Sequence, residues 1–321
     1  MFQKSNLKMT VSAAVLALTI LSAGAKNLSV TITGADGRPI SGFLVGATQE
    51  GIRIAANESG QGVSEIKQSE VSEITFNEMP EGWQEANVQF KAGDFVNAEG
   101  GFTALAEKYK GIGLLKDKYG AMARYYQLMC LKENRKLPQL AAALGVLRTH
   151  PIALSEHYMK ILIGLKPWGL VGKEDWDGVL AIVSENQESS DRPRAKFKAG
   201  VTRSQIAELS YLAGLAQIRK GEKERGLENL YRSLTLNNGS DLNLSKAAIT
   251  EALEQLKEAD SDELKREAYA IATFYRAAIG KGSIEPEFMH LLKALPPLPE
   301  PEAAEGAEGA EGAEAADGAE E

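Results

Sequence analysis

Residues 86–105 read ANVQFKAGDFVNAEGGFTAL, a stretch in which the pair Gly93-Asp94 separates two segments whose apolar residues have helical spacing. Outward from this stretch, from about residue 80 to 294, apolar residues recur at positions i, i+3, i+4 and i+7, as on the buried face of an amphipathic helix. Prolines, which helix interiors tolerate poorly, mark helix ends at Pro151, Pro167, Pro193 and Pro286. The spacing predicts about eight to ten helices in antiparallel pairs and a mainly α chain.

Two parts of this region resemble the tetratricopeptide repeat, a family of stacked helical hairpins. The matching residues are Ala86, Gly93, Ala98, Phe102 and Leu105 in the first part, and Gly214, Gly221, Gly226, Leu230 and Ser233 in the second. In that family the small residues let the two helices of a hairpin approach, and a glycine ends the first helix in a left-handed conformation. The resemblance implies a degenerate solenoid over residues 80–294, with units about 40 residues apart rather than the family's about 34. An unrelated helical bundle is the alternative.

The resemblance also implies where a partner would bind, because such repeats present the first helix of each hairpin to a concave groove. The side chains that would point into this groove are Trp83, Asn87 and Phe90 in the first hairpin, and Tyr211, Leu215 and Arg219 in the second. Aromatic residues serve cores and interfaces alike. Trp83 and Phe90 therefore have a second interpretation, in which they cover the junction with the domain that precedes the helices.

Residues 26–77 are predicted to form that preceding domain from five short strands. Leu28, Val30 and Ile32 alternate with polar residues, and the turn residues ADGRP follow them at 35–39. So short a sheet has little else on which to close its core, and we expect a small, highly curved barrel. The pattern resembles SH3-like or Sm-like barrels but carries no ligand motif. Between Lys26 and Phe76 six acids outnumber four bases, which disfavours RNA as a ligand.

Charge is distributed unevenly along the 321 residues, whose formal net charge is −8. The last 22 residues hold nine of the 44 acids and no base, and the first 25 hold two of the 36 bases, which leaves 35 acids against 34 bases in between. This near neutrality disfavours a general nucleic-acid-binding role. The acidic tail, residues 296–321, is expected to be disordered, either as a solubilising extension or as a regulatory segment. A basic segment, interpreted as an anion-binding site or a solvated loop, contains Arg192, Arg194, Lys196, Lys198 and Arg203.

Residues 1–25 have the three parts of a secretory signal peptide. Lys4 and Lys8 supply the positive region, residues 9–21 the apolar region, and Ala23-Gly24-Ala25 a small-residue cleavage site. We therefore expect export to a bacterial periplasm or beyond, with a mature chain that begins at Lys26. An uncleaved membrane anchor is the alternative, and we expect no transmembrane segment in the mature chain.

The sequence carries no recognisable catalytic or metal-binding motif. Its three histidines are scattered, and its single cysteine, Cys130, lies at the spacing of a buried helix face. We therefore predict no cofactor, no metal and no enzymatic activity. The resulting interpretation is a binding or scaffold protein of the cell envelope, which holds another envelope protein or a cell-wall polymer. The alternatives are a hydrolase of envelope polymers, whose carboxylates the fold would bring together, and an assembly component that oligomerises through the barrel.

Overall fold

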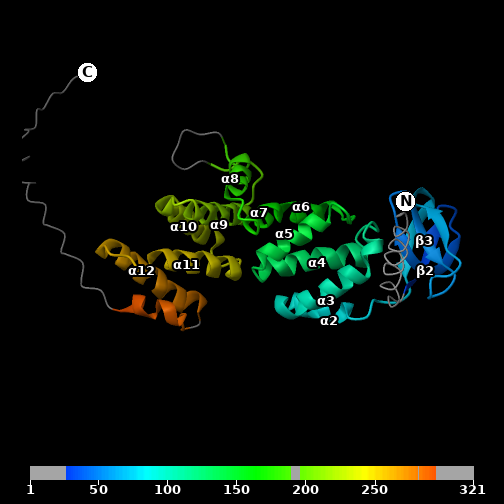
Figure 1. Cartoon of the computed structure of the whole chain (residues 1–321), viewed down its shortest axis with the longest axis horizontal. Coiled ribbons are helices and arrows are strands. Elements are labelled where there is room, and N and C mark those ends of the chain that lie inside the picture. Colours follow the sequence, from blue (N-terminus) through cyan, green and yellow to red (C-terminus); the bar gives the residue numbers. More distant parts are fainter. Residues whose placement is uncertain (1–26, 189–195, 281, 294–321) are drawn as a thin grey trace, which may run out of the picture. The chain divides into compact units, whose positions relative to one another are not determined.

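A computed structural model describes residues 27–188, 196–280 and 282–293 of the chain (Figure 1). Five strands come first and helices follow, so the expected β-domain and mainly α region are confirmed in that order. The chain divides into two compact units, Met1–Ala248 and Ile249–Glu321. The predicted signal peptide and acidic tail lie outside the described residues, as do Pro193, Arg192 and Arg194.

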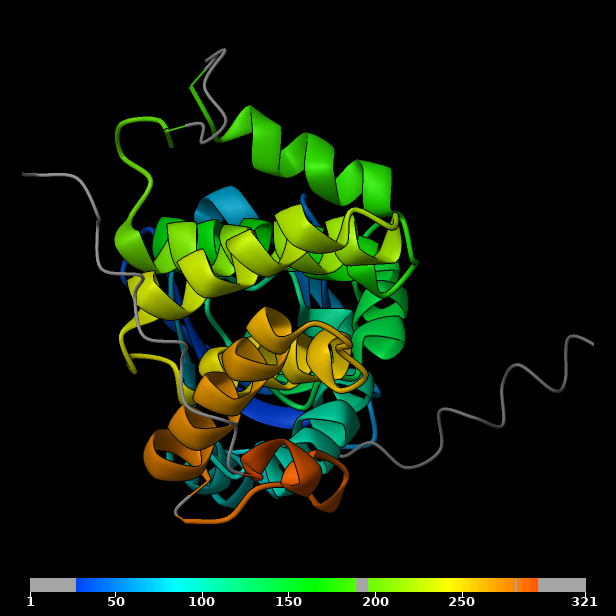
Figure 2. The same ribbon diagram turned by 90° about the vertical axis from the view of Figure 1, so that its left-hand side faces the viewer.

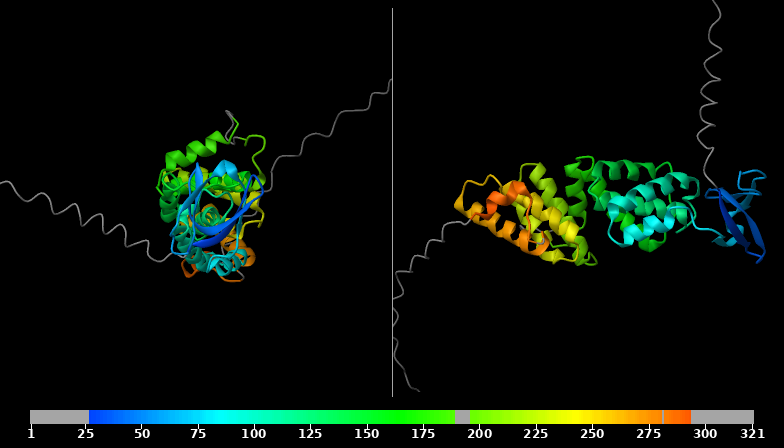
Figure 3. Two further views of the ribbon diagram at one scale, coloured as in Figure 1. Left: turned by 90° about the vertical axis from the view of Figure 1, so that its right-hand side faces the viewer. Right: turned by 90° about the horizontal axis from the view of Figure 1, so that it is seen from below.

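The five strands form one antiparallel sheet in the order β4-β3-β2-β1-β5 (Figure 3, in blue). Their bounds are β1 Leu28–Gly34, β2 Pro39–Ala47, β3 Gly51–Ala55, β4 Ser64–Lys67 and β5 Val71–Phe76. Alternate residues of β1 point into the core, where Val30 and Ile32 are completely buried. The sheet is open, because among the described residues its edge strands β4 and β5 are joined only by a 3-10 turn, η1 Gln68–Glu70.

The described residues contain eleven α-helices, α2 to α12. Their bounds are α2 Trp83–Lys91, α3 Phe95–Lys108, α4 Tyr119–Glu133, α5 Leu137–Val146, α6 Glu156–Gly164, α7 Lys166–Val171, α8 Trp176–Glu185, α9 Arg203–Arg219, α10 Lys223–Asn237, α11 Leu242–Leu256 and α12 Asp262–Phe274. Three short segments complete the set: η2 Lys110–Ile112, the π-helical η3 Tyr275–Ile279, and η4 Pro286–Leu292. The eleven α-helices are one more than the eight to ten predicted, and the break expected at Pro167 is present, because Pro167 sits in the first turn of α7, directly after α6.

The sheet and helices α2 to α4 share one hydrophobic core. Ile32 and Ile52 of the sheet and Phe102 of α3 are among its fully buried members. At its border the Trp83 ring packs edge-on against Tyr119, with ring centroids 4.8 Å apart, and Tyr119 packs edge-on against Phe76 at 4.9 Å. A row of aromatic contacts therefore runs from α2 over α4 to β5, and it holds the β-domain against the first helices.

Helices α2 and α3 approach closely through small residues. Ala86 and Ala98 are buried, and a Cβ atom added to Gly101 would lie 2.8 Å from the Cβ of Ala86. Gly93 follows α2 with a φ of 78°, in the left-handed region that a residue with a side chain rarely adopts. Asp94 then begins α3 by accepting a hydrogen bond from the Asn97 backbone N–H at 3.3 Å.

Helices α9 and α10, drawn side by side in yellow-green in Figure 2, repeat this arrangement. A Cβ atom on Gly214 would lie 2.8 Å from the carbonyl oxygen of Gly226, so each helix presents a glycine to the other. Gly221 follows α9 with a φ of 86°. Ala86, Gly214 and Gly226 thus lie at close contacts between the helices of these two hairpins, and Gly93 and Gly221 follow the first helix of each.

The second unit contains the end of α11 together with α12, η3 and η4. Phe288 of η4 is completely buried, and the Tyr275 hydroxyl donates a hydrogen bond of 2.6 Å to Glu285. These contacts fix the last described turns onto α12. In neither unit does the described part of the chain contain a helix long and apolar enough to cross a membrane.

Candidate binding site between helices α6 to α9

The interior of the first unit contains a polar cluster centred on Trp168. This residue is completely buried on the short helix α7, and its indole Nε1–H donates a hydrogen bond of 2.5 Å to Oε1 of Glu208 on α9. Its ring stacks on Tyr211, one turn further along α9, with centroids 5.6 Å apart. The Pro167 break thus turns a large aromatic ring into the interior, where α9 covers it.

A largely buried lysine also binds Oε1 of Glu208. The Lys132 ammonium of α4 lies 2.8 Å from Oε1 of Glu208 and 3.6 Å from a carboxylate oxygen of Glu133. Burial alone would lower the pKa of Lys132, but the two carboxylates outweigh it, so this pKa is raised above its ordinary value. The lysine is therefore a permanent cation, and it neutralises Glu208 from the interior side.

Arg135 extends the cluster to the start of α11. Its guanidinium carbon lies 4.6 Å from the centroid of the Trp168 ring and 5.3 Å from that of Tyr211, which places a cation against both rings. Its Nη2 donates a hydrogen bond of 3.3 Å to the carbonyl oxygen of Asn243, whose own side chain donates to Glu133 at 3.1 Å. The cluster therefore connects helices α4, α7, α9 and the first turn of α11.

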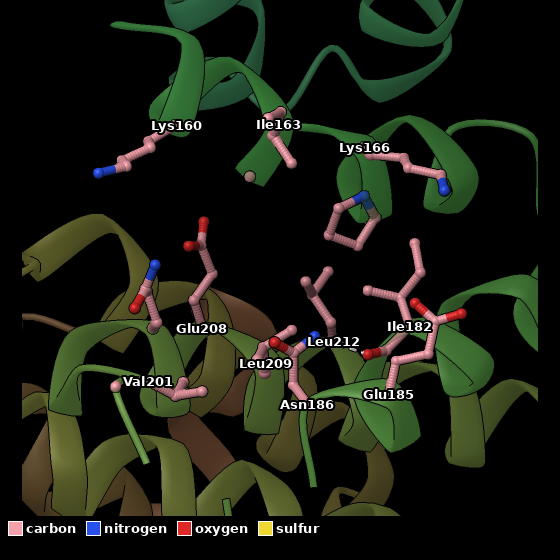
Figure 4. Close-up of a pocket in the computed structure, with 14 residues that line it drawn as sticks. Lys160, Ile163, Lys166, Ile182, Glu185, Asn186, Val201, Glu208, Leu209 and Leu212 are labelled. Atoms are coloured by element: carbon pink, nitrogen blue, oxygen red, sulfur yellow. Dashed lines mark hydrogen bonds between the residues drawn. The ribbon is translucent and has the colours of Figure 1, made fainter. Parts of the chain in front are cut away.

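A cavity of about 400 Å³ opens between α6–α7 on one side and α8–α9 on the other (Figure 4). Its apolar walls are Ile163, Pro167, Ile182, Val201, Leu209 and Leu212. Its charged groups are Lys160, Lys166, Glu185 and Glu208. In Figure 4 the Glu208 carboxylate points toward the cavity, so this residue belongs both to the cavity wall and to the Trp168 cluster.

The two sides of the cavity carry opposite charges. The lysines Lys160 and Lys166 belong to α6–α7, whereas the carboxylates Glu185 and Glu208 belong to α8–α9. Lys160 pairs at 2.7 Å with Glu156 one turn earlier on α6, and Glu208 pairs with Lys132. Within the described part of the chain, Lys166 and Glu185 make no ion pair. The cavity therefore offers one cation and one anion, on facing walls, to an incoming group.

The first three predicted groove residues lie elsewhere, in and around the aromatic core of α2 to α4. Trp83 is half-buried and packs edge-on against Phe102 at 5.7 Å, while Phe90 packs against Tyr126 at 4.8 Å. Asn87 is also half-buried between them on α2. Trp83 thus lies at the border with the β-domain, through Tyr119 and Phe76, whereas Phe90 packs among the rings of α3 and α4.

The second set of predicted groove residues is mostly interior. Tyr211 and Leu215 are each 7% exposed, and Tyr211 stacks on Trp168. Only Arg219, at the end of α9, is exposed. The expectation that Tyr211 and Leu215 present a binding surface is therefore corrected: a side chain so deeply buried stabilises the packing of α9 and is not open to a partner.

The described half of the basic segment borders the cavity. Lys196 and Lys198 are exposed, and the Lys198 backbone N–H donates a hydrogen bond of 2.9 Å to the carbonyl of Asn186, a cavity-lining residue. Arg203 is committed elsewhere, because its guanidinium donates to the carbonyls of Leu236 at 2.8 Å and Thr235 at 3.2 Å at the end of α10. Arg203 therefore has a structural role, whereas Lys196 and Lys198 place positive charge beside the cavity.

Other reactive groups in the described residues do not converge. Burial, and then the charges of Glu99 and Glu133, raise the pKa of Cys130 to about 12, so this thiol is buried as expected and inert. In the described parts of the chain no three His, Cys, Asp or Glu side chains lie close enough together to hold a metal ion. No family model, no curated protein and no solved structure matches the chain.

Proposed function

We propose that this chain is a non-enzymatic binding protein that holds a polypeptide partner at the cavity between α6–α7 and α8–α9. One observation carries the proposal. Ile163, at the mouth of the apolar-walled cavity, is 65% exposed. Because Ile163 adjoins the cavity, its exposed side chain and the apolar walls form one continuous apolar surface, the kind of surface that binding sites present.

The lining of the cavity favours a polypeptide over a cell-wall polymer. Polysaccharides are held chiefly by stacking of sugar rings on aromatic side chains, and among the described lining residues none is aromatic. Apolar walls with a few amides and charges suit an apolar side chain on a polar backbone instead. Asn186 and Gln205 provide such amides beside Glu208.

The arrangement of Glu208 and Glu185 argues against the hydrolase alternative. A hydrolase of envelope polymers needs one carboxyl group that holds a proton and one that is ionised. Glu208 is already bound by the Lys132 ammonium and the Trp168 indole, both on Oε1. Of the two carboxyl groups that line the cavity, one therefore has a structural role in connecting α4, α7 and α9.

In this proposal the helices form a degenerate tetratricopeptide-like array, and the β-domain is a small SH3-like or Sm-like barrel that stays open between its edge strands β4 and β5. Support for the array comes from α2, α4, α6 and α9, which begin at Trp83, Tyr119, Glu156 and Arg203 and are each followed by a second helix; the additional helix α8 lies between the last two pairs. Support for a barrel comes from register shifts within the β1–β5 and β2–β3 pairs, which bend strands. The signal-like residues 1–25 support export to the cell envelope.

The partner contact can be tested by site-specific photocrosslinking. A benzophenone side chain at position 163 should give a polypeptide adduct in the native envelope. Val96 on α3, which is 69% exposed, provides a control position of equal exposure. An adduct that forms equally from positions 163 and 96, or that forms from neither, would refute the assignment of the contact.

A further inference from the structure

We propose that the cavity binds a short apolar peptide whose two charged ends are free. The proposal rests on the proposed function, because it names the class of polypeptide that the cavity takes. It arises from the juxtaposition of a positive wall, a negative wall and an apolar floor within one cavity.

The charged residues of the cavity favour a peptide whose amino and carboxyl ends are both free. Lys166 on α7 and Glu185 at the end of α8 line the cavity from facing walls, and neither makes an ion pair among the described residues. Both residues are exposed, and a ligand that makes a charged contact with each of them carries an anion and a cation. A peptide with a free carboxylate and a free ammonium has this pattern, whereas an internal segment of a protein has an uncharged backbone.

The apolar floor of the cavity and its volume favour a small apolar peptide. Leu209 and Leu212 of α9 and Pro167 of α7 form an apolar surface between the charged walls. Burial of a branched aliphatic side chain on such a surface contributes about 1.5–3 kcal/mol. The volume of about 400 Å³ lies near the lower end of the range for small-molecule sites, about 300–1,000 Å³. Two or three residues therefore fit better than a folded element.

Glu208 provides an acceptor for the peptide backbone. Its two interior hydrogen bonds, from Trp168 and Lys132, both end on Oε1. This leaves Oε2 as an acceptor for a backbone N–H of the ligand, since the carboxylate points toward the cavity (Figure 4). Because Lys132 already neutralises Glu208, an uncharged backbone N–H of the ligand suits Oε2 of Glu208. The ammonium group of the ligand would then bind Glu185, which has no ion-pair partner among the described residues.

Calorimetric titration of the full chain with the dipeptide Leu-Leu tests the proposal, with N-acetyl-Leu-Leu-amide as the capped comparison. We expect Leu-Leu to bind, and the capped form to bind at least about tenfold more weakly because both charged contacts are lost. Lys166→Gln and Glu185→Gln should each weaken Leu-Leu about 2- to 5-fold at low salt, as removal of one partly exposed ion pair does. The matched controls Lys173→Gln and Glu174→Gln, exposed residues just after α7 and outside the cavity lining, should leave binding unchanged.

Two outcomes would overturn the inference. Equal binding of the capped and free dipeptides would show that internal segments are accepted, which refutes the requirement for free ends and leaves the proposed function intact. Absence of Leu-Leu binding at about 10 mM, with a crosslink still formed from position 163, would likewise overturn only the inference. Absence of both binding and crosslink would remove the proposed function as well.

Discussion

The ion pair between Lys132 and Glu208 can be tested by removing its cation. Lys132→Met keeps the length of the side chain and leaves the Trp168 indole as the remaining partner of the carboxylate among the described residues. Loss of one member of a fully buried pair costs about 3–5 kcal/mol. Here the two side chains are 15% and 26% exposed, so water recovers part of the loss, and we expect about 2–3 kcal/mol.

The assay follows from the position of the tryptophans. All three of them, Trp83, Trp168 and Trp176, lie in the first unit, so intrinsic fluorescence reports its unfolding alone. For a unit of this size each kcal/mol corresponds to about 2–4 °C, and the midpoint of Lys132→Met should fall by about 4–12 °C. The double variant Lys132→Met/Glu208→Met, which removes both charges, should recover at least half of this loss because no unpaired charge remains. A single variant within about 0.5 kcal/mol of the unchanged protein, or a double variant no better than the single one, would refute the reasoning.

The ion pair of Lys132 and Glu208 also predicts how the stability of the first unit depends on pH. Because the folded-state pKa of Lys132 lies above its ordinary value of 10.5, its contribution is fully present below that value and is lost as pH rises through the folded pKa. The stability difference between the unchanged protein and Lys132→Met should therefore be constant from about pH 6 to 9 and shrink above about pH 10.5. A difference that shrinks on acidification within pH 6 to 9 would contradict this assignment.

Three further predictions concern packing, processing and reactivity. Ala98 is completely buried on α3, so Ala98→Leu should overpack its surroundings and lower the free energy of unfolding by about 1–3 kcal/mol. Ala104→Leu, on the exposed face of α3, should leave the melting temperature almost unchanged. Equal melting temperatures for the two variants would contradict close packing at Ala98. N-terminal sequencing of the exported protein should begin at Lys26, and a membrane-bound chain that still begins at Met1 would revive the anchor. Cys130 should resist a thiol reagent at pH 8 in the folded protein and react once the chain is unfolded, and rapid labelling of the folded protein would contradict its burial.

The element types could be predicted from sequence because they depend on local spacing. The alternation of Leu28, Val30 and Ile32 identifies β1, and the recurrence of apolar residues at three and four positions identifies the helices. The prolines were also informative, since Pro167 begins α7 and Pro286 begins η4. Closure of the sheet could not be predicted in the same way, because it depends on whether β4 and β5 pair, and no local pattern encodes a contact between two edge strands.

The groove residues show a different limit of sequence reasoning. Trp83 and Phe90 are seven residues apart on α2, and Tyr211 and Leu215 are four apart on α9, so each pair has the spacing of one helix face. Spacing does not say whether another helix covers the face. Phe102 and Tyr126 cover Phe90, and Trp168 covers Tyr211. The same spacing of aromatic residues is therefore found on a helix face that packs inside the protein and on one that binds a partner, and the sequence alone does not distinguish the two.

The cavity was missed because its parts come from four helices and one loop, none of which carries a motif of its own. The signal that could have found it is the sequence KPWG at 166–169, where a proline breaks a helix directly before a tryptophan. A broken helix must bury the tryptophan against a neighbour, and the indole N–H then requires an acceptor. That acceptor, Glu208, also lines the cavity, so the residue that satisfies the buried indole is the one that any ligand in the cavity would meet. A ligand that binds Glu208 is therefore connected by direct contacts to α4, α7 and α9, and binding at the cavity should stabilise the packing of all three.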